Sequence, residues 1–160
     1  MPIQVSIPVF TSRNRYALSV GRPNLCAHSS ILPTCTGRSP FPLDVGDVLI
    51  HAGDLTENGS FDEVQAELDW LSSQPHRYKT LVARNHEVLL DDAVLSRYPE
   101  RRYGQSETRH DLDWGSATYL GNSDVVLDFP GLERRLKVYG SPTTPRYGVS
   151  AFQTPRNRGV

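Results

Sequence analysis

Two short stretches of this chain carry side chains that can bind metals or move protons. Asp54 closes the run Gly46–Asp54, which reads GDVLIHAGD, and the pair Asn85–His86 follows a second apolar segment. A carboxylate, an amide oxygen and an imidazole are ligands that divalent metals accept in proteins. Metal ions held in this way activate water for hydrolysis. The pattern therefore indicates half of a metal-dependent hydrolase site.

The segments before these side chains are predicted strands. The nearly continuous apolar run at 47–52 is bounded by glycines, which is typical of a strand buried on both faces. Residues 78–83 form a second predicted strand. Open α/β sheets assemble their sites at the carboxyl ends of strands, so we expect Asp54 and Asn85–His86 to face each other.

A helix is predicted between these two strands. Ser60 and Glu63 have the spacing of a capping box, in which each side chain accepts a hydrogen bond from the other residue's backbone amide. Pro75 ends the helix. The apolar residues at helical spacing are Phe61, Val64, Leu68 and Leu71. Residues 46–83 are thus predicted to form a β-α-β unit with parallel strands.

The second half of the chain predicts short strands with antiparallel pairing at 117–140, including a hairpin around Pro130–Gly131. Residues 88–98 are compatible with a short helix or an irregular loop, and 101–114 with a loop. We therefore expect an α/β fold. Its predicted organisation is a disordered or divergent leader at 1–40, a domain at 41–156 and a tail at 157–160.

Composition narrows the class of protein. The chain has 160 residues, 38% of them hydrophobic and 22% charged, with a formal net charge of −1. This balance gives no electrostatic reason to expect nucleic acid or an anionic membrane as a partner. No apolar run approaches the roughly 18 residues of a membrane-spanning helix. Cys26 and Cys35 do not make a disulfide framework, and we interpret them as unpaired thiols of a cytoplasmic protein.

The N-terminal segment offers an alternative location. Every Asp and Glu lies at or beyond Asp44, and the residues before it are rich in Arg, Ser and Pro. Such acid-free segments resemble mitochondrial transit peptides. Pro8 and Pro23 would interrupt the amphipathic helix that import requires. The cytoplasmic prediction is therefore preferred, with mitochondrial targeting as the alternative.

Taken together, the motifs at Gly53–Asp54 and Asn85–Glu87 resemble those of calcineurin-like metallophosphoesterases. Tyr119–Leu120 and Tyr139–Pro142 resemble stretches of the small metallophosphoesterase-domain proteins related to cyclic-nucleotide phosphodiesterases. The resemblance runs from about Gly37 to Arg156. It implies part of a metallophosphoesterase-type β-sandwich flanked by helices.

The resemblance also implies a role for each site residue. Asp54 would bridge two divalent metals, a pair of Mn, Fe or Zn ions. Asn85 would bind one metal through its amide oxygen. His86 would face the substrate, a small phosphoester or nucleotide, and protonate the leaving alkoxide. His51, one pleat before the tip of its strand, would support the site.

Four departures from the family pattern weaken the prediction of activity, one of them Thr143, which stands where relatives tend to carry tryptophan. The expected Asp-x-His-Gly motif is replaced by Thr34–Gly37, whose hydroxyls are poor metal ligands. Arg84 stands where the family has glycine. A side chain there should disturb a left-handed backbone, and the guanidinium should repel a metal unless it points outward and binds a phosphate. We also expect the family's late histidine motifs to lie outside this chain. Catalysis is therefore predicted to be impaired. A metal-free module that binds a nucleotide or phosphate, or an inactive fragment, is the alternative.

Other polar clusters have simpler interpretations. The side chains of Asp91–Asp92, His110 and Asp113 can bind metals, but their polar loop setting predicts solvated surface. The turn Gly140–Pro142 is explained equally well as the border of a substrate pocket and as the exit from a strand.

Overall fold

The computed structural model describes residues 3–6, 25–28, 46–146 and 148–155. Its helices and strands are named in chain order, with α for α-helices, η for 3-10 helices and β for strands. They are β1 (Ile3–Ser6), β2 (Leu25–His28), β3 (Val48–His51), α1 (Phe61–Ser73), β4 (Tyr78–Leu81), η1 (Val88–Leu90), α2 (Asp92–Arg97), η2 (Pro99–Arg102), β5 (Ala117–Tyr119), β6 (Ser123–Phe129), η3 (Pro130–Leu132), β7 (Arg134–Gly140), β8 (Thr144–Pro145) and β9 (Gln153–Thr154).

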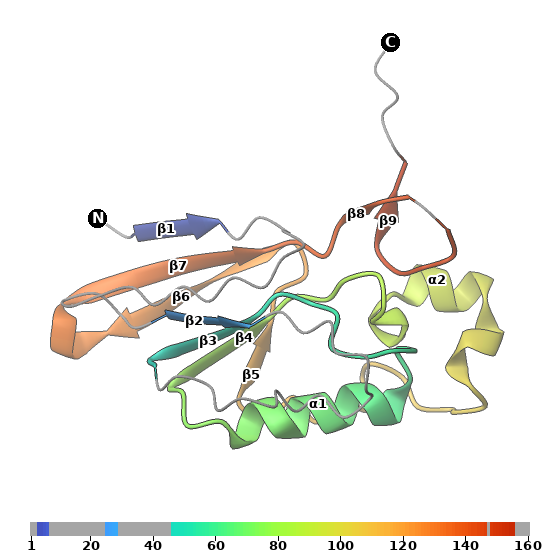
Figure 1. Ribbon diagram of the computed structural model, residues 1–160, viewed down its shortest axis with the longest axis horizontal. Coiled ribbons are helices and arrows are strands. Elements are labelled where there is room, and N and C mark those ends of the chain that lie inside the picture. Colours follow the sequence, from blue (N-terminus) through green and yellow to red (C-terminus); the bar gives the residue numbers. More distant parts are fainter. Residues whose placement is uncertain (1–2, 7–24, 29–45, 147, 156–160) are drawn as a thin grey trace, which may run out of the picture.

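The strands form two main sheets. One has the order β2-β3-β4-β5 with parallel pairing throughout, and the other has the order β1-β7-β6. A third, two-stranded sheet joins β8 to β9. Figure 1 shows the two main sheets as separate layers, with α1 against the outer face of the four-stranded sheet. The predicted α/β class is confirmed.

The sequence of β3 explains its central position. All four of its residues are buried, as predicted for a strand covered on both faces. Val48 and Ile50 pack in a cluster with side chains of β6 and β7, between the two sheets. Leu49 points the other way and packs in a cluster with the apolar face of α1. The alternation of side chains along a strand thus lets β3 serve both cores.

The helix α1 forms as predicted. The side chain of Ser60 accepts a hydrogen bond from the amide of Glu63, whose carboxylate accepts one from the amide of Ser60. These bonds satisfy two backbone donors that a helix start would otherwise leave without partners. The helix ends at Ser73, before Pro75. It returns the chain to β4, which pairs in parallel with β3.

The second half differs in part from the prediction. The antiparallel hairpin is confirmed, because β6 and β7 pair from Ser123↔Gly140 to Phe129↔Arg134 around η3. β5 was expected to be antiparallel, but it pairs in parallel with β4 and extends the four-stranded sheet. Residues 88–98 form short helices, and the loop predicted at 101–114 begins with the end of η2.

Strands also occur earlier than expected. We expected ordered structure from about Phe41, yet β1 pairs with β7 and β2 pairs with β3. The strand beside β3 is therefore Leu25–His28, upstream of Thr34–Gly37. Cys35, Thr34–Gly37 and the predicted tail at 157–160 lie outside the described residues. Within the described part of the chain, no helix has the length and apolarity to cross a membrane.

Candidate functional site

The backbone after β3 turns sharply at Gly53 and Asp54. Their φ angles are 89° and 55°, in the left-handed region. Glycine adopts this region without steric cost, and aspartate tolerates it better than most residues. A Cβ added to Gly53 would lie 2.1 Å from Cγ of Arg84, so only glycine fits beneath that side chain. The turn places the Asp54 carboxylate beside the loop that follows β4.

Glu87 joins the two loops. Its side chain is fully buried and accepts four backbone hydrogen bonds. One oxygen, Oε2, accepts from the amides of Arg84 at 2.6 Å and Asp54 at 3.3 Å. The other, Oε1, accepts from the amides of Leu55 at 2.7 Å and Thr56 at 3.2 Å. A single carboxylate therefore fixes the loops after β3 and β4 to each other. Burial raises the pKa of Glu87, against the lowering effect of the amides that bind it.

Arg84 turns inward and forms an ion pair with Asp54. The side chains are only 11% and 10% exposed. Burial raises the pKa of Asp54, while the charges of Arg84 and His86 act in the opposite direction. The expected conflict between Arg84 and a left-handed backbone does not arise, because positive φ angles at this edge fall on Gly53 and Asp54.

The Asn85–His86 pair lies at the same edge, immediately after Arg84. The backbone carbonyl of Asn85 accepts a hydrogen bond from Ala151 at 3.1 Å, which ties this loop to the segment between β8 and β9. Nδ1 of His86 lies 2.9 Å from the carbonyl oxygen of Glu57. Since a carbonyl only accepts, Nδ1 carries the proton of this bond, which holds the exposed imidazole beside Glu57.

The structure thus brings together the residues that the sequence singled out. Asp54 and Asn85–His86 lie on loops that follow two adjacent parallel strands and share the Glu87 carboxylate. His51, expected to support the site, is fully buried in β3. The metal-binding roles of Asp54 and Asn85 and the catalytic role of His86 stay predictions.

The described residues do not fit a metal pair. In the part of the chain that the structure describes, no group of three or more His, Cys, Asp and Glu side chains is placed to hold a metal ion. The carboxylate of Asp54 is engaged by a guanidinium. A dinuclear centre needs several ligands for each ion, and a cation already bound to Asp54 opposes a second one.

Two acidic residues have roles that sequence reasoning missed. Asp91, expected at the solvated surface, caps α2 by accepting from the amides of Ala93 and Val94. It also accepts from the amide of Phe152 at 2.6 Å. Asp92, His110 and Asp113 are exposed, as predicted. The local signal for Asp91 was an N-cap position before a helix.

Glu67 is the second missed residue. It lies on the inner face of α1 and is 7% exposed. Burial raises its pKa to about 7, and the nearby charge of Glu87 adds to this effect. Its position three residues after Val64 placed it on the apolar face, so the helical spacing was sufficient to find it.

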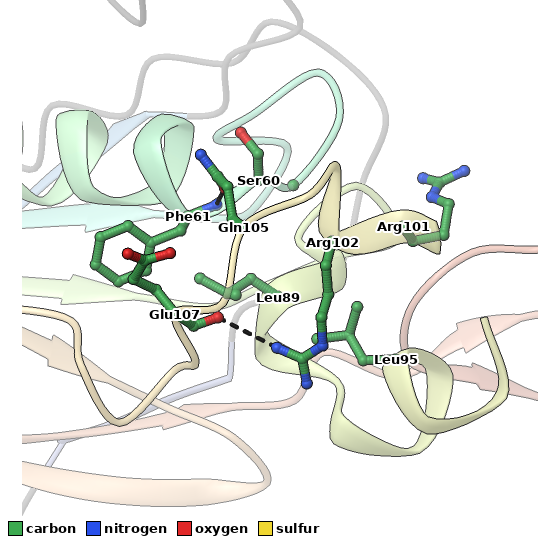
Figure 2. Close-up of a pocket in the computed structure, with 9 residues that line it drawn as sticks. Ser60, Phe61, Leu89, Leu95, Arg101, Arg102, Gln105 and Glu107 are labelled. Carbon is green, nitrogen blue, oxygen red and sulfur yellow. Dashed lines mark hydrogen bonds between the residues drawn. The ribbon is translucent and has the colours of Figure 1, made fainter. Parts of the chain in front are cut away.

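Two further places offer polar side chains to a ligand. At the turn after β7, the hydroxyl of Ser141 donates to the side-chain oxygen of Asn122 at 2.6 Å. This bond is explained by a turn that ends a strand, without a substrate pocket. A shallow hollow lies at the start of α1. Figure 2 shows Arg102 hydrogen bonded to the carbonyl of Glu107, at 3.2 Å, and Arg101 pointing away. Arg102 is thus held by a backbone carbonyl, and Arg101 is not directed into the hollow.

Comparison with known proteins adds partial matches. No model of a known family matches the chain. Over 125 residues it is 31% identical to metallophosphoesterase domain-containing protein 1 of Homo sapiens, covering 76% of this chain and 38% of that protein. It is 30% identical over 159 residues to a UPF0046 protein of Caenorhabditis elegans, covering 99% of this chain and 50% of that protein.

A further match is to a protein of Emericella nidulans named probable rhamnogalacturonate lyase C. It is 48% identical over 111 residues, which is 69% of this chain but 10% of that protein. The chain thus spans between a tenth and half of the length of these three relatives. The name of the human protein agrees with the resemblance found in the motifs. The chain is therefore similar to metallophosphoesterase domain-containing proteins.

Proposed function

We propose that this chain is part of a calcineurin-like metallophosphoesterase domain whose hydrolytic site, as far as the described residues form it, does not bind a metal pair. The observation that carries the proposal is the placement of Asp54 and Asn85–His86 on loops after adjacent parallel strands, joined through Glu87. The similarity to the human metallophosphoesterase domain-containing protein supports the family assignment.

The proposed chemistry of the family is hydrolysis of a small phosphoester or nucleotide in the cytoplasm. A divalent metal pair would supply an activated water molecule and stabilise charge on the phosphoryl group. Because the donor set here does not fit that pair, no hydrolytic step is assigned to this chain. In an intact site of the family, the residue at the position of His86 would protonate the leaving alkoxide; here Nδ1 of His86 lies against the carbonyl of Glu57.

The alternative is a metal-free module that binds phosphate or a nucleotide through Arg84. This function requires the guanidinium to leave Asp54, where it is almost fully buried. The cost of separating a nearly buried carboxylate from the guanidinium opposes this exchange. The ion pair therefore favours the first proposal.

The test is a measurement of metal and activity on the same purified chain. Bound Mn, Fe and Zn are measured by mass spectrometry, and hydrolysis of an aryl phosphodiester is compared between wild type and Asp54→Asn. Asparagine is preferred to alanine because it tolerates the left-handed backbone at this position.

We expect less than one metal ion per chain and no difference in hydrolysis between the two proteins. Stoichiometric metal together with hydrolysis that disappears in Asp54→Asn would show that the chain is an active metalloenzyme. Saturable binding of inorganic phosphate by the metal-free protein, lost in Arg84→Ala, would instead support the alternative.

A further inference from the structure

We infer that the guanidinium of Arg84 takes the place of a metal cation at Asp54 and holds the site together without metal. This inference rests on the proposed function, because it assumes that the Asp54 loop descends from a metal site. It goes beyond that proposal by assigning two roles of a metal ion to Arg84. The side chain balances the charge of Asp54 and joins the two loops.

The first argument is the position of the guanidinium. It is paired with the carboxylate of Asp54, and both side chains are close to 10% exposed. The aliphatic stem of Arg84 lies directly over Gly53 and occupies the space that a Cβ at position 53 would need. The cation is therefore packed into the turn that presents Asp54.

The second argument is electrostatic. Asp54 and the fully buried Glu87 place two carboxyl groups at one edge of the sheet, with the amide of Asp54 bonded to the second. Two buried acids in such proximity require a nearby cation or protonation. Arg84 provides a permanent positive charge, because its guanidinium does not lose its proton in proteins. Its backbone amide also donates to Glu87, so one residue serves both acids.

The third argument concerns what a metal would otherwise do. A bridging metal fastens the loops after two strands to each other. Here the same connection is made by the Arg84–Asp54 pair across the loops and by the four amide bonds of Glu87. These contacts between described residues therefore join the two loops without a metal. Removing the guanidinium should open the Asp54 carboxylate to another cation.

The test is cation rescue of stability in Arg84→Ala. Urea unfolding is measured for wild type, Arg84→Ala, Asp54→Asn and the double variant, with and without about 10 mM Mn²⁺. The matched control is Lys137→Ala, which breaks the exposed ion pair of Lys137 with Asp124. We expect the unfolding equilibrium constant of Arg84→Ala to rise at least about tenfold, since a nearly buried charge loses its partner.

Mn²⁺ should lower the unfolding equilibrium constant of Arg84→Ala by at least about threefold, because an ion that binds only the folded state stabilises it. No recovery is expected in wild type, in Asp54→Asn, in the double variant or in Lys137→Ala. This pattern separates a replaced metal from an ordinary ion pair, which would show the loss without the rescue.

A loss in Arg84→Ala that Mn²⁺ does not reduce would overturn the inference, and so would the absence of any loss. If Arg84→Ala does not fold, Arg84→Gln keeps most of the stem without the charge, and the same response to Mn²⁺ is required of it. Failure of the proposed function is recognised separately, by stoichiometric metal in wild type held through Asp54. Wild type without metal and variants without rescue would leave the proposed function intact and refute only this inference.

Discussion

Replacing Glu87 by glutamine removes a charge but little volume, so it tests whether this carboxylate fastens the two loops. The native oxygens divide the work, Oε1 accepting from Leu55 and Thr56, and Oε2 from Arg84 and Asp54. In Glu87→Gln one of these oxygens becomes an NH₂ group, which cannot accept. Whichever way the amide turns, two backbone N–H groups lose their acceptor.

The size of the effect follows from this count. Each lost hydrogen bond to a charged group costs about 1.5–3 kcal/mol, which gives roughly 3–6 kcal/mol for two. Relief from burying the carboxylate charge offsets part of this cost, because burial raises the pKa of Glu87. We therefore expect the free energy of unfolding to fall by about 3 kcal/mol, a large share of the stability of a typical domain.

The assay is urea unfolding followed by circular dichroism, with Glu63→Gln as the matched control. Glu63 also accepts three hydrogen bonds, from Asn58 and Ser60, but at partly exposed positions where water can replace the carboxylate. Its loss should stay below about 1 kcal/mol. Equal losses in the two variants would refute the idea that Glu87 fastens the loops.

Two further substitutions test the missed acids. Asp91→Ala should lower the free energy of unfolding by about 2–3 kcal/mol, because it removes a helix cap and the acceptor for Phe152. Urea unfolding of the exposed neighbour variant Asp92→Ala, expected within about 0.5 kcal/mol of wild type, is the control, and equal losses would contradict the prediction. For Glu67, the folded pKa is about 7 against an ordinary value of 4.5, so its stabilising protonation is complete below pH 4.5 and lost as the pH rises to about 7. Above that range Glu67→Gln should be more stable than wild type by up to about 3 kcal/mol, with no gain below pH 4.5; a gain independent of pH in thermal melts would count against this account.

The sequence predicted those parts of the fold that depend on local signals. The apolar run of β3 reports burial on both faces, and the capping box at Ser60 fixes the start of α1. Both signals act over a few residues and require nothing from the rest of the chain. The same locality explains why the amino-acid pattern alone could place the strand ends carrying Asp54 and Asn85–His86 at one edge of the sheet.

Long-range pairing had no such signal. β1 pairs with β7 near the other end of the chain, and β5 joins β4 in parallel across the helices that follow β4. Parallel pairing leaves no turn signature between the partners, because the connection is long. The short, Pro-interrupted N-terminal segment therefore did not predict the strands β1 and β2, and β5 was assigned to the wrong kind of pairing.

The sequence placed Asp54 and Asn85–His86 at one edge of the sheet, but it did not predict the contacts that join their loops. Arg84 was recognised as a departure from the family pattern, and its effect was expected to be repulsion of a metal. Its partner is decided by the left-handed turn at Gly53 and Asp54, which brings the carboxylate under the guanidinium. Glu87 was visible in the sequence as part of a motif, but its function depends on amides from two loops that only the folded sheet brings together.

These connections bear on how the buried acids at this edge of the sheet are compensated. A metal site that loses ligands leaves buried carboxylates uncompensated, and such charges destabilise the fold by several kcal/mol. An arginine at position 84 supplies the missing charge from within the chain, and Glu87 keeps the two loops in register through neutral amides. This edge of the sheet is therefore maintained by its own polar contacts, which keep the loops of Asp54 and Asn85–His86 side by side.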